Sequence, residues 1–428
     1  MKVGICPVCG SPITEKVWKN YRSKVVDKKR FDCPECGTEL YVDPSLSIEE
    51  FEMHRGKALI KYPGLTLGIE VESYSIDLES LEFKSMAPIY PKNGSIEKGE
   101  GYIYDKTIGS EYNSPVFTSL NEAFFRIKIG LRKYFVDLEE SETKRIALIA
   151  SYGKINETAG IHYHVGPERG KALEEEVADY VTPYIHQQIP FIIAITANSP
   201  IINGSITDIA SNRMLFNGES MCSALNRTTL EGMSGFSHFD EINMTSKRVD
   251  KPPTLEVRVA DSNIPEYIIA GLFIVHIVVN AAIKGKPLWN LKYYRQKNYE
   301  AERMDAARRG AKASIRFNKA LLPIPKYIDA FFNFYHDEIE ESNMSEDVLT
   351  IFRLAKNGWV MADIVREAWK KIKKEDPSKN DLMLSKIFAA KYLNAQQRNL
   401  NGENVKTFAK LLGVKLPYLN DVKLGKFF

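Results

Sequence analysis

The stretch Leu65–Ser73 reads "LTLGIEVES", and its strict alternation of apolar and polar residues decides the fold class. Successive side chains of a β-strand point to opposite faces, so this period of two predicts a strand with one buried face and one polar face. The polar face carries Glu70 and Glu72. Their spacing places the two carboxylates on the same side of the sheet, ~6–7 Å apart along the strand.

Two later stretches repeat this arrangement. "AGIHYHVG" (Ala159–Gly166) and "TLEVRVAD" (Thr254–Asp261) each alternate an apolar face with a polar one. A further strand is predicted for "EYNSPVF" (Glu111–Phe117). The paired residues on the two polar faces are His162 and His164 on the first strand, and Glu256 and Arg258 on the second.

Each of these pairs alone has an ordinary explanation. Glu-x-Glu is usually a solvated strand face, His-x-His can be packing, and Glu256 with Arg258 can be a surface ion pair of little consequence. Three strands together, however, gather carboxylates and imidazoles without lysines between them, which is electrostatically unfavourable unless cations bind. Carboxylates with a histidine among them suit Mg²⁺ or Mn²⁺. The combination therefore predicts a metal-dependent enzyme.

Helical patterns lie between the strands. "SLNE" forms a capping box that predicts a helix from Ser119 to about Leu138, and two more helices are predicted at about 169–187 and 189–197. Residues 203–250 are rich in Gly, Ser, Asn and Met and lack clear periodicity. So long an irregular region in a compact domain predicts substrate loops or a lid.

Beyond residue 264 nearly the whole chain is predicted to be helical. The apolar run at Tyr267–Ile283 contains His276 and Asn280 and is short for a membrane span, so it predicts a buried core helix. The chain has 428 residues, enough for two to three domains, and its 58 basic and 55 acidic groups leave a net charge of +3. This balance argues against nucleic acid or a membrane as the main partner.

Four of the five cysteines form "CPVC" and "CPEC", each followed by glycine. Two such pairs about two dozen residues apart predict a zinc ribbon, with two redox or disulfide pairs as the alternative. With four thiolate ligands the zinc is structural. No signal peptide precedes the first pair, so the expected location is the cytoplasm. The predicted zinc ligands are Cys6, Cys9, Cys33 and Cys36.

The motifs also resemble a family. "LGIEVES", "DKTIGSEYNSPVF", "AGIHYHVG", "NSPIINGS", "SNRMLFNG", "TLEVRVADS" and "MDAARRGAKA" occur in the order expected of glutamine synthetase-like carboxylate–amine ligases, with most likeness to the glutamate–cysteine ligase and amidoligase branches. The resemblance covers roughly residues 64–315. Its specificity lies in the combination, because no single motif would suffice.

This resemblance implies an α+β fold, in which helices flank a curved antiparallel sheet that holds two or three divalent cations. The chain is then divided into a zinc ribbon at residues 1–42, a linker at 43–62, a ligase catalytic domain at 63–320, and a helical C-terminal region at 321–428. The ribbon has two open roles, recruitment of a substrate or partner and a contact between copies, since relatives are often homo-oligomers.

Individual residues take roles from the same resemblance. Asp105 lies near a further acidic position of the family, which takes a metal or an ammonium group of a substrate. The residues expected to act in catalysis are Glu70, Glu72, Glu111 and Arg258. The positions that match the family's metal ligands (Mg²⁺ or Mn²⁺) are Glu70, Glu72, Glu111, His162 and Glu256.

Basic residues match the family's nucleotide and substrate contacts. His164 and Arg258 match groups that contact nucleotide phosphates, and Arg213 matches an arginine near the substrate carboxylate. Arg308 matches an arginine of the nucleotide pocket. An exposed helix charge is an equally ordinary explanation for Arg308, and its neighbour Arg309 could be the matching residue instead.

The reaction implied is ATP-dependent formation of an amide bond. A carboxylate attacks the γ-phosphate of ATP to give an acyl phosphate, and an amine then displaces phosphate. The carboxylate belongs to an amino acid, a peptide or a protein. Two alternatives stay open: a metallohydrolase with His162 and His164 as zinc ligands, and an inactive ligase-like scaffold whose ribbon does the binding.

Overall fold

The computed structural model describes most of the chain from residue 65 onward and short segments before it. The described residues are 2–5, 12–14, 30–32, 39–41, 65–77, 80–81, 83–84, 94–97, 100–103, 108, 110–141, 144–155, 157–167, 173–216, 241–244, 253–288, 296–317, 320–419 and 421–426.

The centre of the fold is a nine-stranded sheet in which all described strand pairs are antiparallel. Its main order is β14-β15-β11-β5-β9-β8-β7, and β10 and β6 pair with β5 beside this path. The strands are β5 (Thr66–Asp77), β6 (Phe83–Lys84), β7 (Gly94–Glu97), β8 (Glu100–Ile103), β9 (Ser110–Asn113), β10 (Lys144–Ala147), β11 (Gly160–Gly166), β14 (Ile242–Met244) and β15 (Leu255–Asp261).

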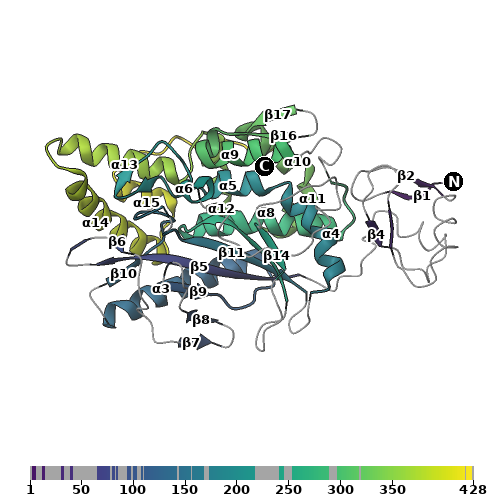
Figure 1. The fold of residues 1–428 in the computed structure, drawn as a ribbon, viewed down its shortest axis with the longest axis horizontal. Helices are drawn as coiled ribbons and strands as arrows, with labels where there is room; N and C mark the ends of the chain where they lie inside the picture. Colours follow the sequence, from purple (N-terminus) through teal and green to yellow (C-terminus); the bar gives the residue numbers. More distant parts are fainter. Residues whose placement is uncertain are drawn as a thin grey trace.

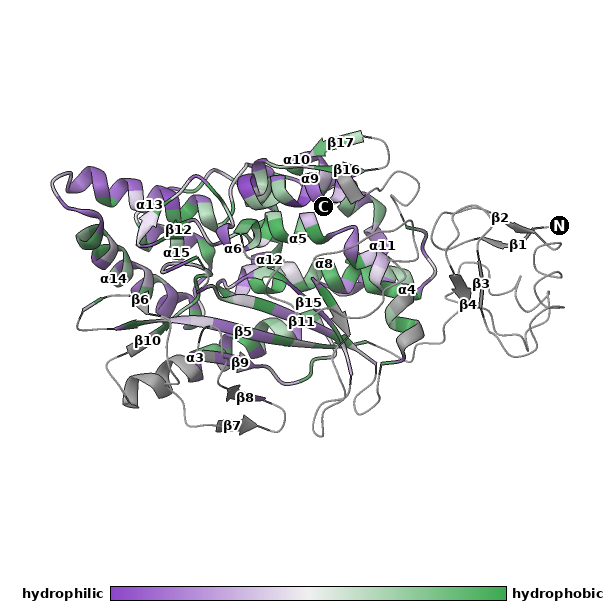
Figure 2. Cartoon of the chain, viewed as in Figure 1, coloured by the Kyte–Doolittle hydropathy of each residue, from purple (hydrophilic) through white to green (hydrophobic). Residues whose placement is uncertain are grey.

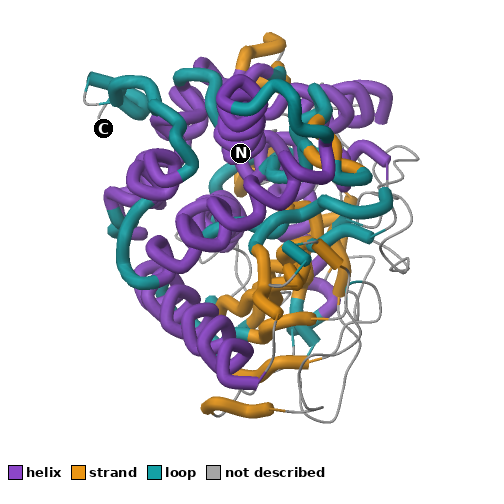
Figure 3. Tube along the Cα trace, turned by 90° about the vertical axis from the view of Figure 1, so that its left-hand side faces the viewer, coloured by secondary structure: helices purple, strands orange, loops and turns teal. Residues whose placement is uncertain are grey.

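Helices pack against the apolar face of this sheet and extend the core away from it (Figures 1 and 3). They are α3 (Leu120–Ser141), α4 (Glu175–His186), α5 (Ile189–Thr196), α6 (Asn212–Phe216), α8 (Pro265–Ile283), α9 (Gln296–Arg309), α10 (Ile324–Phe334), α11 (His336–Ser342), α12 (Glu346–Lys356), α13 (Met361–Glu375), α14 (Asp381–Leu400) and α15 (Val405–Leu411). The mixed α and β architecture with an antiparallel sheet is confirmed.

Helix α8 is the central core helix, as predicted. It is long and apolar enough to cross a membrane, but 83% of its most apolar window is buried inside the protein. Figure 2 shows α8 and α5 as mainly hydrophobic ribbons. Gly271 lets α8 approach β11, because a Cβ there would overlap the ring of Tyr163, whose hydroxyl donates to the Ile268 carbonyl at 2.9 Å.

The predicted start of α3 is confirmed. The amide of Glu122 donates to Ser119 Oγ at 3.2 Å, as a capping box requires. The Glu122 carboxylate reaches one residue further back than expected and accepts from the Thr118 amide at 3.0 Å. These contacts satisfy amides that the first helical turn leaves without partners.

Some elements differ from the sequence-based expectation. Strand β9 ends at Asn113, and Phe117 joins β5 only through an isolated bridge to Leu67. The chain beyond residue 264 is not wholly helical, because β16 (Ser314–Phe317) and β17 (Ala320–Pro323) form a hairpin. The other two-stranded sheets are β1 (Lys2–Ile5) with β2 (Pro12–Thr14), β3 (Arg30–Asp32) with β4 (Glu39–Tyr41), and β12 (Ile201–Ile202) with β13 (Ser205–Ile206).

The C-terminal helices share the core of the sheet. One continuous set of buried apolar residues runs from Leu67 to Leu424. Helix α14 is fastened to strand β10 by Gln396, whose side chain accepts from the Leu148 amide at 2.8 Å and donates to the Ile146 carbonyl at 3.1 Å.

Candidate active site

Strand register brings the predicted pairs together on one face of four adjacent strands. His162 lies opposite Glu70, and His164 lies opposite Glu256. On the other side of β5, Glu72 lies opposite Glu111. Directly opposed residues in an antiparallel sheet point to the same face. The contributing strands β15, β11, β5 and β9 are neighbours in the sheet.

Two acidic triads form on this face and share one histidine. Glu70, His162 and Glu256 make the first triad, and Glu72, Glu111 and His162 make the second. Within each triad the candidate ligand atoms lie within 4.8 Å of one another. His162 Nδ1 is 3.2 Å from both Glu70 Oε2 and Glu256 Oε1, and His162 Nε2 is 3.7 Å from Glu72 Oε1.

The donor set fits hard divalent cations. Carboxylate oxygens dominate both triads, which is the chemistry of Mg²⁺ and Mn²⁺ sites. A neutral imidazole has one lone pair for a metal, so His162 can ligate a cation in one triad at a time. The other triad would then hold its cation through carboxylates.

Histidines control the charge of Glu70. Burial alone would raise the pKa of Glu70, but the charge of His164 and hydrogen bonds from His162 and His164 lower this pKa well below its usual value. Glu70 is therefore ionised and ready to accept a cation.

Backbone and side-chain donors position the second triad. The Gly160 amide donates to Glu72 Oε2, and Ser262 Oγ donates to the Glu72 carbonyl at 2.6 Å. Asn113 Nδ2 donates to Glu111 Oε1 at 2.8 Å. None of these three donors was predicted from the sequence. Asn113 alone carried a signal, because it stands two residues after Glu111 and so shares its face.

Two basic residues lie at the less buried edge of this face. Arg258 Nη1 donates to Glu256 Oε1 at 2.6 Å, and its side chain is 23% exposed. His164 Nδ1 is 2.9 Å from Thr254 Oγ1, while its Nε2 is 3.4 Å from Glu70 Oε1. The candidate ligand groups among the described residues include His162 but not His164. This arrangement does not favour the paired-histidine zinc site of a hydrolase.

Arg308 and Arg309 lie at the C-terminal end of α9. Both are exposed, and Arg309 forms an ion pair with Asp305 of the same helix. The described part of the chain gives Arg308 no ion pair. Of the two, Arg308 is therefore the better candidate for a nucleotide contact, and this role stays a prediction.

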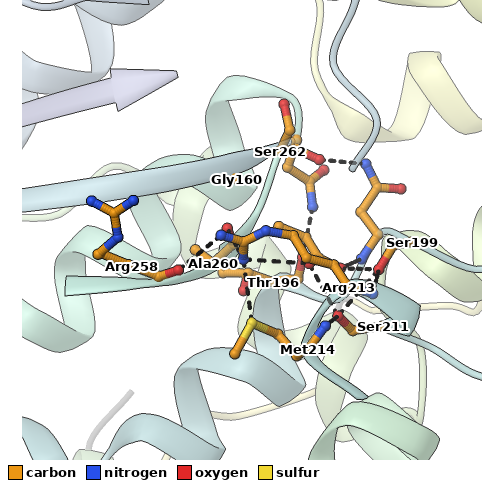
Figure 4. Close-up of polar contacts among 12 residues, drawn as sticks. Gly160, Thr196, Ser199, Ser211, Arg213, Met214, Arg258, Ala260 and Ser262 are labelled. Atoms are coloured by element: carbon orange, nitrogen blue, oxygen red, sulfur yellow. Dashed lines mark hydrogen bonds and ion pairs between the residues drawn. The ribbon is translucent and has the colours of Figure 1, made fainter. Parts of the chain in front are cut away.

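The structure places Arg213, the predicted substrate residue, in the interior of the protein. It is 2% exposed, and its guanidinium contacts the carbonyls of Arg258 and Ala260 instead of an open surface (Figure 4). The predicted site residue Asp105 and the predicted zinc ligands Cys6, Cys9, Cys33 and Cys36 lie outside the described residues.

Comparison with known protein families gives one match. Residues 144–322 match the profile of glutamate–cysteine ligase family 2 (GCS2). This range includes the two histidines of β11 and the strand β15. No match is found among curated protein sequences.

Solved structures give the fold. The complex between the prokaryotic ubiquitin-like protein Pup and its ligase PafA aligns with a TM-score of 0.54 and 14% identity, over 82% of this chain and 80% of that one. A bifunctional glutathione synthetase from Pasteurella multocida aligns with a TM-score of 0.49 and 13% identity, over 82% of this chain and 55% of that one. Glutamate–cysteine ligase from Francisella tularensis in complex with AMP aligns with a TM-score of 0.46 and 10% identity, over 82% of this chain and 97% of that one. The fold assignment rests on the first alone.

Proposed function

We propose that this protein is an ATP-dependent carboxylate–amine ligase that forms an amide or peptide bond through an acyl phosphate. The observation that carries the proposal is the pair of acidic triads that share His162, with Arg258 and His164 beside them. The family match over residues 144–322 supports it, as does the ligase fold of the aligned structure.

The site chemistry suits this reaction. A carboxylate and a triphosphate are both anionic, so the attack of one on the other requires positive charge around the transferring phosphoryl group. Bound Mg²⁺ or Mn²⁺ supplies such charge. In this chain Glu70, Glu72, Glu111, His162 and Glu256 would hold the cations.

Arg258 and His164 would act on the nucleotide. Arg258 is part-exposed and pairs with Glu256, so its guanidinium lies where it would contact a phosphate beside the triads. His164 is fixed by Thr254 and would contact a phosphate from the same face. Arg308 at the end of α9 would be a third basic contact.

The proposed reaction has two steps. The substrate carboxylate oxygen forms a bond to the γ-phosphorus, and the bond between that phosphorus and the β,γ-bridging oxygen breaks to release ADP. The amine then forms the amide bond to the acyl carbon and loses a proton. Phosphate leaves with one oxygen from the substrate carboxylate.

The carboxylate substrate would belong to a peptide or a protein. Support comes from the aligned structure, which is a ligase in complex with the prokaryotic ubiquitin-like protein Pup. The substrate class is tested by ADP release in the presence of single amino acids, peptides or folded proteins. Stimulation by amino acids alone would contradict the peptide or protein assignment.

Oxygen transfer tests the reaction. With ATP, Mg²⁺, an amine and a substrate whose carboxylate carries ¹⁸O, one ¹⁸O should appear in the released phosphate. Glu70→Ala should abolish turnover with an unchanged circular dichroism spectrum. Absence of both amine-stimulated ATP cleavage and nucleotide binding would refute the ligase. Amide hydrolysis without ATP would instead indicate a metallohydrolase.

The zinc ribbon is a separate part of the proposal. Its cation would be structural, so Cys33→Ser should lower the zinc content while ATP cleavage with small substrates continues. Equal loss of ATP cleavage in Cys33→Ser and Glu70→Ala would contradict the proposed division of the chain.

A further inference from the structure

A β-bulge lies at the edge of the candidate cation site. Along the pair β11–β15, Ile161 lies opposite Ala260 and Tyr163 lies opposite Val257. Two residues, Arg258 and Val259, therefore stand opposite the single His162. A bulge interrupts the ladder of hydrogen bonds, so its backbone groups need partners from outside the strand pair.

Arg213 of α6 supplies these partners. Its Nη2 donates to the Arg258 carbonyl at 2.9 Å, and its Nη1 donates to the Ala260 carbonyl at 3.2 Å. On the other side, the Arg258 amide donates to the Glu241 carbonyl at 2.9 Å. Figure 4 shows the guanidinium directed at these carbonyls, with the Arg258 side chain extending away from it. The backbone of Arg258 is thus held from both sides.

Buried polar groups fix Arg213 in turn. Its Nη1 is 3.9 Å from Asp261 Oδ1, and that carboxylate accepts from the hydroxyls of Ser199 and Ser211 at 2.8 and 3.0 Å. The Arg213 amide donates to Ser199 Oγ at 3.1 Å. A guanidinium that is 2% exposed, and whose two terminal nitrogens both donate to carbonyls, is built into the interior of the protein.

Gly160 shows how close the guanidinium lies to the second triad. A Cβ at Gly160 would overlap the Arg213 guanidinium, and the Gly160 amide donates to the Glu72 carboxylate. Arg213 therefore lies behind both triads. It supports the bulge beside Glu256, and it packs against the residue that holds Glu72.

We infer that Arg213 is a positioning residue for the cation site, which holds the bulge opposite His162 so that Glu256 and Arg258 keep their places. The inference rests on the proposed function, because it assigns Arg213 a role in the same site. In this role Arg213 acts through the backbone, because its guanidinium donates to the Arg258 and Ala260 carbonyls. Partners that orient metal ligands typically change metal affinity by about 10–100-fold when removed.

Titration with Mn²⁺ in the absence of nucleotide tests this role. Arg213→Met and Gly160→Ala disturb the same contact in different ways, one by deleting the guanidinium and the other by displacing it. Both should weaken Mn²⁺ binding by about 10-fold or more. The matched control is Arg353→Met, because Arg353 also donates to a backbone carbonyl, that of Val422 at 3.1 Å, away from the sheet. It should lower Tm and leave Mn²⁺ affinity unchanged.

Arg213→Lys separates positioning from general stability. An ammonium keeps a cation beside Asp261 but cannot span two carbonyls as a planar guanidinium does. We expect Arg213→Lys to recover most of the Tm lost in Arg213→Met while Mn²⁺ affinity stays low. Should Arg213→Met fail to fold, Gly160→Ala and Arg213→Lys decide the question by the same comparison.

The outcomes distinguish the two proposals. The positioning role would be overturned if Arg213→Met retained wild-type Mn²⁺ affinity. It would also be overturned if Arg213→Lys restored Mn²⁺ affinity together with Tm. Either result would leave the ligase proposal standing. Failure of the wild-type protein to bind Mn²⁺ and ATP would overturn the ligase proposal itself.

Discussion

At the scale of single residues, the two nitrogens of His162 connect the two candidate cation sites. Nδ1 faces Glu70 and Glu256, and Nε2 faces Glu72. Because one imidazole has one lone pair to give, the triads are not equivalent once a cation binds. The triad that His162 does not ligate depends on its carboxylates alone.

This asymmetry predicts a pattern in metal titrations. Glu256→Gln should weaken Mn²⁺ binding at one site, and Glu111→Gln should weaken it at the other. His162→Ala should weaken binding at whichever site the imidazole ligates. Each loss of Mn²⁺ affinity should be at least about 10–100-fold. Calorimetric titration of each variant gives the number and affinity of the sites. Loss of both sites in Glu256→Gln and in Glu111→Gln alike would contradict two separable triads.

Glu70 makes stability depend on pH. Its pKa is lowered in the folded protein, so its ionisation stabilises the fold above the unfolded-state pKa of about 4.3. This contribution is lost as the pH falls through the lower folded-state pKa. In EDTA, Glu70→Gln should therefore reduce the free energy of unfolding at neutral pH and progressively less in acid. Urea denaturation at several pH values measures this, and a difference independent of pH would refute it.

At the scale of elements, the contact of α8 with β11 depends on Gly271. Alanine favours helices, yet Gly271→Ala would force its Cβ into the Tyr163 ring and should destabilise the protein by about 1–3 kcal/mol. Thermal denaturation gives the change. The loss should be smaller in a Tyr163→Phe background, which removes the hydroxyl that the Cβ would meet. Equal losses in the two backgrounds would contradict this explanation.

Strands with one buried face were predictable from sequence, and irregular pairings were not. The alternation of "LGIEVES" and "IHYHV" placed Glu70, Glu72, His162 and His164 correctly on one face. "LEVRVAD" alternates just as regularly, yet its pairing with β11 contains a bulge. A residue of β15 is extra only relative to its partner strand, so the sequence of β15 alone does not reveal the bulge. The β16–β17 hairpin, a local pairing after α9, was also not predicted.

The charged residues of the candidate site were predictable from the sequence, whereas the residues that hold them in place were not. Carboxylates and imidazoles are recognisable as candidate ligands from the residue type alone. Gly160 and Ser262 instead contact Glu72 from positions 88 and 190 residues later in the chain, and the sequence does not reveal such contacts. Arg213 shows the reverse problem. Its motif suggested a substrate contact, but only the packing of α6 against β15 reveals where its guanidinium lies.

At the scale of the whole molecule, the C-terminal helices and the sheet share one buried apolar core, so we expect them to unfold as one cooperative unit. Gln396 is buried and bonds the Ile146 carbonyl within β10 and the Leu148 amide just after it, so Gln396→Ala would leave a carbonyl and an amide unsatisfied. Such groups cost roughly 1–3 kcal/mol each. The urea transitions that near-ultraviolet circular dichroism and ATP cleavage report should then both move to a lower urea concentration, by the same amount. Separate transitions would contradict a single unit.

The same contact bears on how the protein behaves at high concentration. Strand β10 pairs with β5 on one side, and an uncovered opposite edge would be a template for strands of other molecules. The side-chain amide of Gln396 bonds the Ile146 carbonyl and the Leu148 amide, as a neighbouring strand would. The Tyr392 hydroxyl donates to the Leu148 carbonyl at 2.6 Å. Helix α14 therefore covers this edge, and we expect this cover to limit strand pairing between molecules.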